Sequence, residues 1–190
     1  MFFSRGSGLT SGAIAYASAP LRATLGGKLR DVPSHGGIKF NFVGDDASPV
    51  AAEAHAATDW HLLPWSAIAA KRAQDPRRRL WLVPLEFEYK ELADLWFRAN
   101  HQLGLWDYSV RQLFNLYLWR RGFKRPAKTA KIDCTEAVSR LVFPDKDLRC
   151  IAGVDRHDCV TPANLFAGLG RAGYQRHEVL PSAASGGRAA

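Results

Sequence analysis

The chain has 190 residues, of which 47% are hydrophobic and 23% are charged, a composition typical of a globular domain with a sizeable core. No stretch approaches the ~20 apolar residues that a membrane span requires, so we expect no transmembrane segment. Lys and Arg number 26 against 18 Asp and Glu, a net charge of +8, which favours contact with an anionic surface such as nucleic acid, a membrane or a cell-wall polymer.

The first half of the chain predicts one helix and several short strands. Small residues over 9–25 indicate a helix interrupted at Pro20. Residues 37–44 alternate apolar and polar side chains, the pattern of a half-buried strand. Further strands are predicted over 50–57, 60–65 and 80–87, antiparallel to their neighbours.

The other predicted elements are helices. Residues 65–74 predict a helix for which Ser66 could act as a cap, and apolar residues spaced three and four apart predict another over 89–104. Further helices are predicted over 108–123, from Cys134 and over 161–169.

One domain over residues 1–179 follows from this order, with a disordered tail over 180–190. We predict an α+β fold, in which helices pack on one side of a small antiparallel sheet or half-barrel.

Three cysteines, Cys134, Cys150 and Cys159, are too few for a disulfide framework, although a single Cys150–Cys159 bridge stays open. A zinc site formed by Cys150, His157 and Cys159 would lack a C-x-x-C pair and a fourth ligand, so we expect no metal and no cofactor. The first 20 residues make a weak signal peptide because Gly, Thr and Ser interrupt their apolar stretch. We therefore expect the protein in the cytoplasm of a bacterium or of a phage-infected cell.

Cys134 is the candidate nucleophile. It stands where a short apolar run meets a helix, and either Asp133 or Thr135 could cap that helix. A helix N-terminus favours the thiolate through its unpaired N–H groups and dipole, and a nearby imidazole favours it further. The alternative is a buried core thiol, which is a common environment for free cysteine.

His35 is the candidate base, because it directly precedes a strand and is followed by two glycines that allow close approach. A third polar group should orient its ring. Glu53 is the candidate, since an acid among alanines on an apolar strand needs a partner. His55 lies on the same strand face and could replace Glu53.

Three ordered motifs, "SHGGI" (34–38), "AEA" (52–54) and "CTEAV" (134–138), resemble those of the circularly permuted, YiiX-like branch of the NlpC-type cysteine peptidases. In that branch a histidine strand comes first, a strand carrying "EA" follows and the cysteine helix comes last. The stretch "GLWDYSVRQLF" is similar to the tyrosine segment before the nucleophile. The chain departs from the family at Gly36, where valine is usual, and at Thr135, which replaces serine.

The resemblance implies a permuted papain-like fold with Cys134 as nucleophile, His35 as base and Glu53 as orienting residue, and it suggests Tyr108 as a substrate-binding residue. It also implies hydrolysis or acyl transfer at an amide or ester through a thioester, on a cell-wall peptide or a lipid.

Two other functions stay open. The basic runs at 77–79 and 120–125 are interleaved with aromatic residues, as in proteins that bind nucleic acid, although no groove-reading motif accompanies them. The same fold could also form a non-catalytic binding or structural module.

Overall fold

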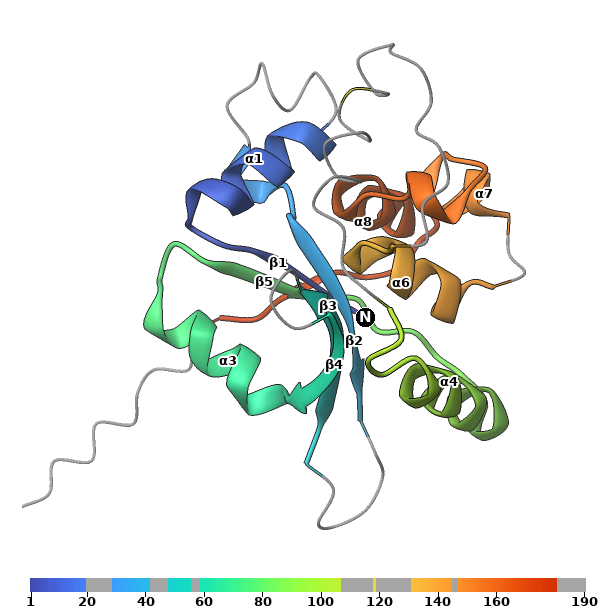
Figure 1. Cartoon of the computed structure of the whole chain (residues 1–190). Coiled ribbons are helices and arrows are strands. Elements are labelled where there is room, and N and C mark those ends of the chain that lie inside the picture. Colours follow the sequence, from blue (N-terminus) through green and yellow to red (C-terminus); the bar gives the residue numbers. More distant parts are fainter. Residues whose placement is uncertain are drawn as a thin grey trace, which may run out of the picture.

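A six-stranded antiparallel sheet, in the order β4-β3-β2-β1-β5-β6, forms the centre of the computed structural model (Figure 1). The structure describes residues 1–19, 29–41, 48–55, 59–106, 118, 131–144 and 147–180. The strands are β1 (Phe2–Arg5), β2 (His35–Phe40), β3 (Val50–His55), β4 (Asp59–Pro64), β5 (Arg79–Leu82) and β6 (His177–Glu178).

Helices occupy much of the rest of the described chain. They are α1 (Leu9–Ser18), α3 (Trp65–Gln74), α4 (Tyr89–His101), α6 (Cys134–Val142), α7 (Leu148–Ala152) and α8 (Pro162–Arg171), with short 3-10 helices η1 (Leu29–Asp31) and η2 (His157–Cys159). The predicted α+β class is confirmed, and so are the helices at 65–74, 89–104, 134 onward and 161–169.

Helices cover both faces of the sheet, so the prediction that they pack on one side is wrong. On one face, Phe3, Ile38 and Trp81 share a core with α4, α6, α7 and α8, whereas on the other Phe2, Ala51 and Leu80 pack with Ile68 of α3. Figure 1 shows α3 on the opposite side of the strands from α6 and α4. Successive strand residues point to opposite faces, so the adjacent Phe2 and Phe3 contribute to different cores.

The sequence pattern did not predict strand β1, which has only four residues and is too short to show an alternation. It nevertheless occupies a central position, pairing with β2 through Phe3↔Gly36 and with β5 through Phe3↔Trp81. The Met1 amino group extends this pairing by donating to the Val83 carbonyl over 2.8 Å. The residues considered as a signal peptide therefore supply β1 and α1.

Local sequence explains several helix boundaries. Helix α1 stops at Ser18, and Ala19 is extended, as the residue before a proline prefers. A capping box of Glu88 and Glu91 starts α4. Ser66 does not cap α3. The N-cap residue of this helix is Pro64, whose side chain makes no capping hydrogen bond.

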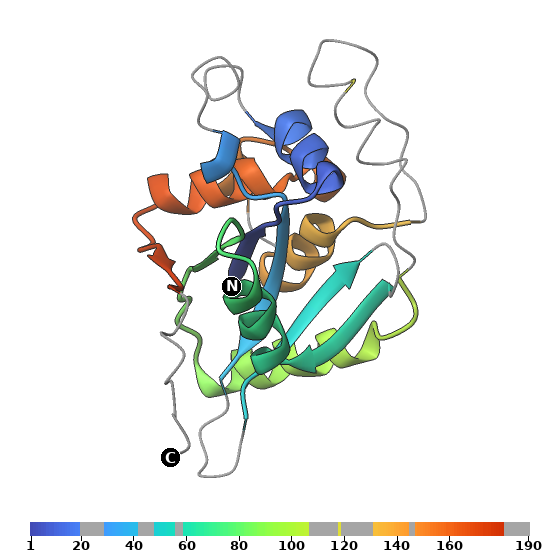
Figure 2. The ribbon, with the colours of Figure 1, turned by 90° about the vertical axis from the view of Figure 1, so that its left-hand side faces the viewer.

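At one end of the molecule, α1 and α8 lie against each other through Ala15 and Ala163 (Figure 2).

The N–H of Val179 donates to the Leu80 carbonyl over 2.8 Å, so the last described residues join the same sheet. The predicted helix at 108–123 lies outside the described residues apart from residue 118, and so does the predicted tail at 180–190 apart from Leu180.

The three cysteines are free, so the Cys150–Cys159 bridge is not formed. The described residues hold no group of His, Cys, Asp or Glu side chains arranged to bind a metal ion. Among the helices that the structure describes, none has the length and apolar character to cross a membrane.

Gly168 is the closest point between α7 and α8, since a Cβ added there would lie 1.4 Å from the Ile151 carbonyl oxygen. We expect Gly168→Ala to lower the free energy of unfolding by about 3 kcal/mol, because backbone must move to accept the methyl group. Urea unfolding measures the change.

The matched control is Gly170→Ala in the same helix. A Cβ there would meet only the guanidinium end of the exposed Arg176 side chain, which can move. A loss of stability as large in the control as in Gly168→Ala would contradict the close packing of α7 on α8.

Candidate active site

The three residues proposed from the sequence meet at one end of the sheet. Cys134 is the first residue of α6, His35 is the first residue of β2, and Glu53 lies in β3. A hydrogen bond of 2.8 Å joins His35 to Glu53, and Cys134 lies close enough to His35 to shift the pKa of its ring. Of the other predicted residues, His55 lies beside this group, and Tyr108 lies outside the described residues.

Strand register places Glu53 next to His35. Glu53 pairs with Gly37 of β2, so the His35 side chain is its diagonal neighbour on the same face. The His35 Nε2 lies 2.8 Å from the Glu53 Oε2. Gly37 is required here, because a Cβ would lie 2.4 Å from the Phe2 ring. The Phe2 ring thus fills the place of a side chain beside the carboxylate.

Gly36, one of the two departures from the family pattern, brings α6 against β2. A Cβ at this position would lie 3.2 Å from the Thr135 Cγ2, which belongs to the other departure. The two departures therefore contact each other. Without a side chain at Gly36, the first turn of α6 lies directly on the strand that carries His35.

Asp133 caps α6, as one of the two sequence alternatives predicted. Its Oδ1 accepts hydrogen bonds from the Thr135 and Glu136 N–H groups over 2.9 and 2.8 Å. The N–H of Cys134 is not bonded to any described residue. The cap therefore satisfies the second and third N–H groups of the helix and leaves the first, at the thiol, free to bind an anion.

The charges of His35 and Glu53 support each other. Burial works against the imidazolium, but the interactions of the ring with Cys134 and with Glu53 raise the pKa of His35 to about 10. Burial likewise opposes the carboxylate, but the hydrogen bond and charge of His35 lower the pKa of Glu53 to about 2. At neutral pH both side chains are ionised and form a partly buried ion pair.

His55 does not take the place of Glu53. Its ring centroid lies 6.1 Å from that of His35 in an edge contact, and no hydrogen bond joins the two rings. Burial and the nearby positive charge of His35 lower the pKa of His55, so it stays neutral. Glu53 is therefore the group that fixes the orientation of the His35 ring.

His61 also belongs to this group, although the sequence analysis did not select it. It pairs with Glu53 across β3 and β4, and its Nε2 lies 3.8 Å from the Glu53 Oε1. The signal was present in the alternation of "DWHLLP" (59–64), but it required the register of two strands to be interpreted.

Cys134 itself is 1% exposed and belongs to the larger core cluster. Cys134 is therefore buried, as the alternative of a core thiol predicted. That alternative does not account for the influence of Cys134 on the pKa of His35, nor for the ion pair behind that ring. The sulfur is covered, but it is placed beside a base.

The Glu53 carboxylate should make stability depend on pH. Glutamate in the unfolded chain takes up a proton near pH 4.5, whereas Glu53 in the folded protein does so at about pH 2. Its stabilising contribution is complete above pH 4.5 and is lost as the pH falls toward 2. The difference in unfolding free energy between wild type and Glu53→Gln should therefore shrink over this interval.

Urea unfolding at several pH values measures this difference, with exposed Glu86 changed to Gln as the control. A wild-type advantage over Glu53→Gln that stays constant from pH 4.5 to 2 would argue against the ion pair.

Comparisons with known proteins do not extend this description. No protein-family model matches the sequence, and no curated protein or solved structure matches it. The function is therefore inferred from the residues of the site.

Proposed function

We propose that the protein is a cysteine hydrolase or acyltransferase that acts on an amide or ester through a thioester on Cys134. One observation carries the proposal: a thiol at a helix N-terminus, an imidazole and a carboxylate converge from three separate elements. This is the arrangement of a nucleophile, a base and an orienting group. The chain order, histidine strand first and cysteine helix last, agrees with the permuted papain-like fold that the motifs suggest.

In the proposed mechanism the thiol proton already rests on His35, so that Cys134 and His35 form a thiolate–imidazolium pair, and the thiolate attacks the substrate carbonyl carbon. The backbone N–H of Cys134, free of described partners, donates to the oxyanion. The intermediate then collapses as the bond to the leaving group breaks, and His35 transfers its proton to that group. Water, or another acceptor, attacks the thioester with the help of His35 and restores the thiolate–imidazolium pair.

Glu53 has an orienting role in this scheme. Its hydrogen bond to Nε2 of His35 leaves the other ring nitrogen, Nδ1, for the thiol. It also stabilises the imidazolium that forms when the thiol loses its proton. The chemistry uses only protein side chains and a backbone donor.

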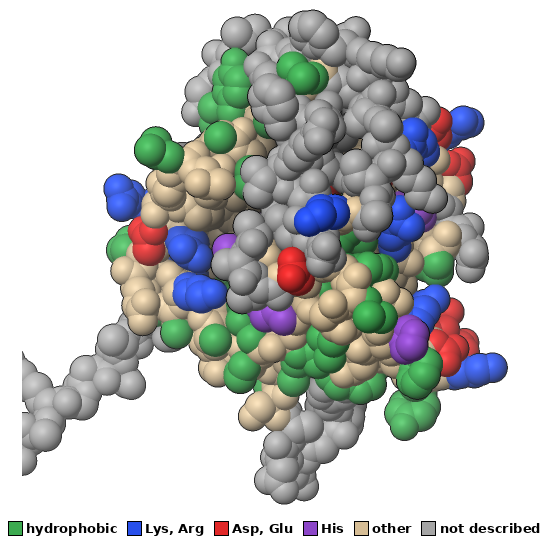
Figure 3. Space-filling model, in the orientation of Figure 1, with side chains coloured by type: hydrophobic (Ala, Val, Ile, Leu, Met, Phe, Trp, Pro, Cys, Tyr) green, Lys and Arg blue, Asp and Glu red, His purple; other side chains and the backbone are tan. Residues whose placement is uncertain are grey.

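A nucleic-acid-binding function has less support. In the run 77–79, Arg79 forms ion pairs with Glu178 and Asp31, and Arg77 lies 3.6 Å from Asp75. Figure 3 shows the described Lys and Arg side chains of that face scattered among Asp and Glu rather than gathered in one patch. The second basic run, 120–125, lies outside the described residues.

The first test compares the three thiols. We expect iodoacetamide at pH 6 to label Cys134 at least tenfold faster than either Cys150 or Cys159, although Cys150 is exposed and Cys134 is buried. An unactivated thiol is almost fully protonated at this pH, and only the thiolate reacts. His35→Ala should slow the labelling of Cys134 by about tenfold or more. Mass spectrometry of the labelled peptides gives the rates.

His177→Ala is the control, since His177 is exposed in β6, at the edge of the sheet away from β3. It should leave the rate close to that of the wild type. Labelling of Cys150 as fast as that of Cys134 would refute the proposal that Cys134 is activated.

A second test separates Glu53 from His55 as the orienting residue. We expect Glu53→Gln to slow the labelling of Cys134 at pH 6 by about tenfold, because the charge that stabilises the imidazolium is removed. His55→Gln should change the rate little, since His55 makes only a ring contact with His35. The opposite order of effects would assign the orienting role to His55.

A further inference from the structure

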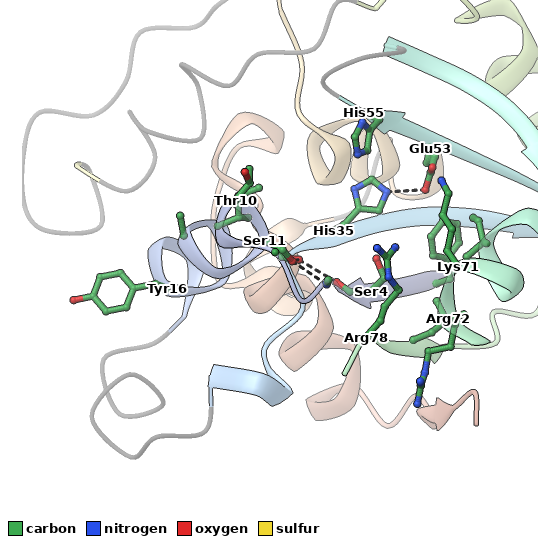
Figure 4. A pocket seen from close by; sticks show the side chains of 18 of the residues that line it. Ser4, Thr10, Ser11, Tyr16, His35, Glu53, His55, Lys71, Arg72 and Arg78 are labelled. Carbon is green, nitrogen blue, oxygen red and sulfur yellow. Dashed lines mark hydrogen bonds and ion pairs between the residues drawn. The ribbon is translucent and has the colours of Figure 1, made fainter. Parts of the chain in front are cut away.

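A cavity of about 790 Å³ opens beside His35 and Glu53, on the side of the sheet that carries α3 (Figure 4). Its volume lies within the range of small-molecule binding sites. His35, Glu53 and His55 line it, but Cys134 does not. A ligand in the cavity would therefore contact the proposed base from the side away from the core.

Most of the cavity wall is apolar. Helix α1 contributes small and aliphatic side chains, and the sheet and α3 contribute larger ones. The apolar lining consists of Ala13, Ile14 and Ala17 with Phe2, Ile68 and Leu80. Such a wall favours an apolar chain or ring system.

The charged groups of the wall are mostly positive. Lys71, Arg72 and Arg78 line the cavity, whereas Glu53 is its one described carboxylate and is already paired with His35. In Figure 4 the ends of Lys71 and Arg78 point toward the His35–Glu53 pair, while Arg72 turns away. An anion beside His35 would therefore meet two basic side chains.

Arg78 is the strongest single indication of an anionic ligand. It is half-buried, and its Nε is fully covered and has no hydrogen-bond partner. The arginines on either side of it are paired with acids: Arg77 with Asp75, and Arg79 with Asp31 and Glu178. Among the described residues, the Arg78 side chain forms no ion pair, and its charge acts only at longer range on Asp75, which already pairs with Arg77. An unpaired guanidinium in a partly desolvated site is costly unless a ligand supplies the anion.

We infer that this cavity binds an anionic amphiphile, whose carboxylate or phosphate contacts Arg78 and Lys71 while its apolar portion lies along α1. Binding of such a molecule does not depend on the proposed function. Only the further step, that this molecule is the class of substrate on which Cys134 acts, rests on the proposed function. It places the charged group next to His35 and the apolar group away from it.

Titration calorimetry with three ten-carbon probes tests the inference: decanoate, decyl phosphate and the neutral decanol, each below its micelle concentration. We expect at least one of the two anions to bind wild-type protein, and decanol to bind about tenfold more weakly or not at all. The stronger anion identifies the headgroup as carboxylate or phosphate. Hexanoate should bind more weakly than decanoate, because each buried methylene adds about fourfold in affinity.

Arg78→Gln should weaken anion binding by about tenfold and leave decanol unaffected. Arg77→Gln is the matched control, because it removes the same charge from the adjacent position, where the side chain is exposed and does not line the cavity. Thermal unfolding of both variants establishes that they are folded.

Equal affinities for decanoate and decanol, equal effects of the two arginine variants, or no binding of any probe would overturn the inference. None of these probes carries an amide or ester, so binding does not require thioester chemistry. Binding without selective labelling of Cys134 would keep the cavity and reject the hydrolase. Selective labelling of Cys134 without binding of any probe would keep the hydrolase and reject the proposed ligand of the cavity.

Discussion

The ion pair between Glu53 and His35 is the interaction on which the site depends. A carboxylate with 8% of its side chain exposed cannot remain ionised inside a sheet without a partner, and His35 supplies one over 2.8 Å. The same bond occupies one ring nitrogen and so orients the other for Cys134. Removing either charge would leave the other in an unfavourable environment. The pair therefore links the stability of β2 and β3 to the geometry of the proposed chemistry.

Two adjacent glycines allow the surrounding elements to approach this pair from both faces of β2. Gly37 makes room for the Phe2 ring beside Glu53, and Gly36 makes room for Thr135 at the start of α6. Strand β1, which carries Phe2, thereby takes part in shaping the site as well as in completing the sheet. Gly37 is required because a Cβ there would lie 2.4 Å from the Phe2 ring, whereas at Gly36 a Cβ would make a tight 3.2 Å contact with Thr135.

The site has two sides with different physical character. Cys134 lies on the core side, 1% exposed, where the helix N-terminus leaves one N–H free. The cavity lies on the other side, where Arg78 forms no ion pair among the described residues and the charge of Lys71 acts on Glu53. His35 is the residue common to both. A substrate held in the cavity would thus be near the base, and it would reach the sulfur once the atoms covering the thiol move aside.

The sequence by itself determined the α+β class, most helices and the identity of Cys134, His35 and Glu53 as a candidate group, because these depend on local patterns and on ordered motifs. It did not predict β1, the packing of α3 on the second face of the sheet, or the roles of His61 and Arg78. These features depend on which strands pair and in which register, and on where neighbouring charges find partners. A four-residue strand and an unpaired arginine have no local signature, so only the tertiary structure decided their positions.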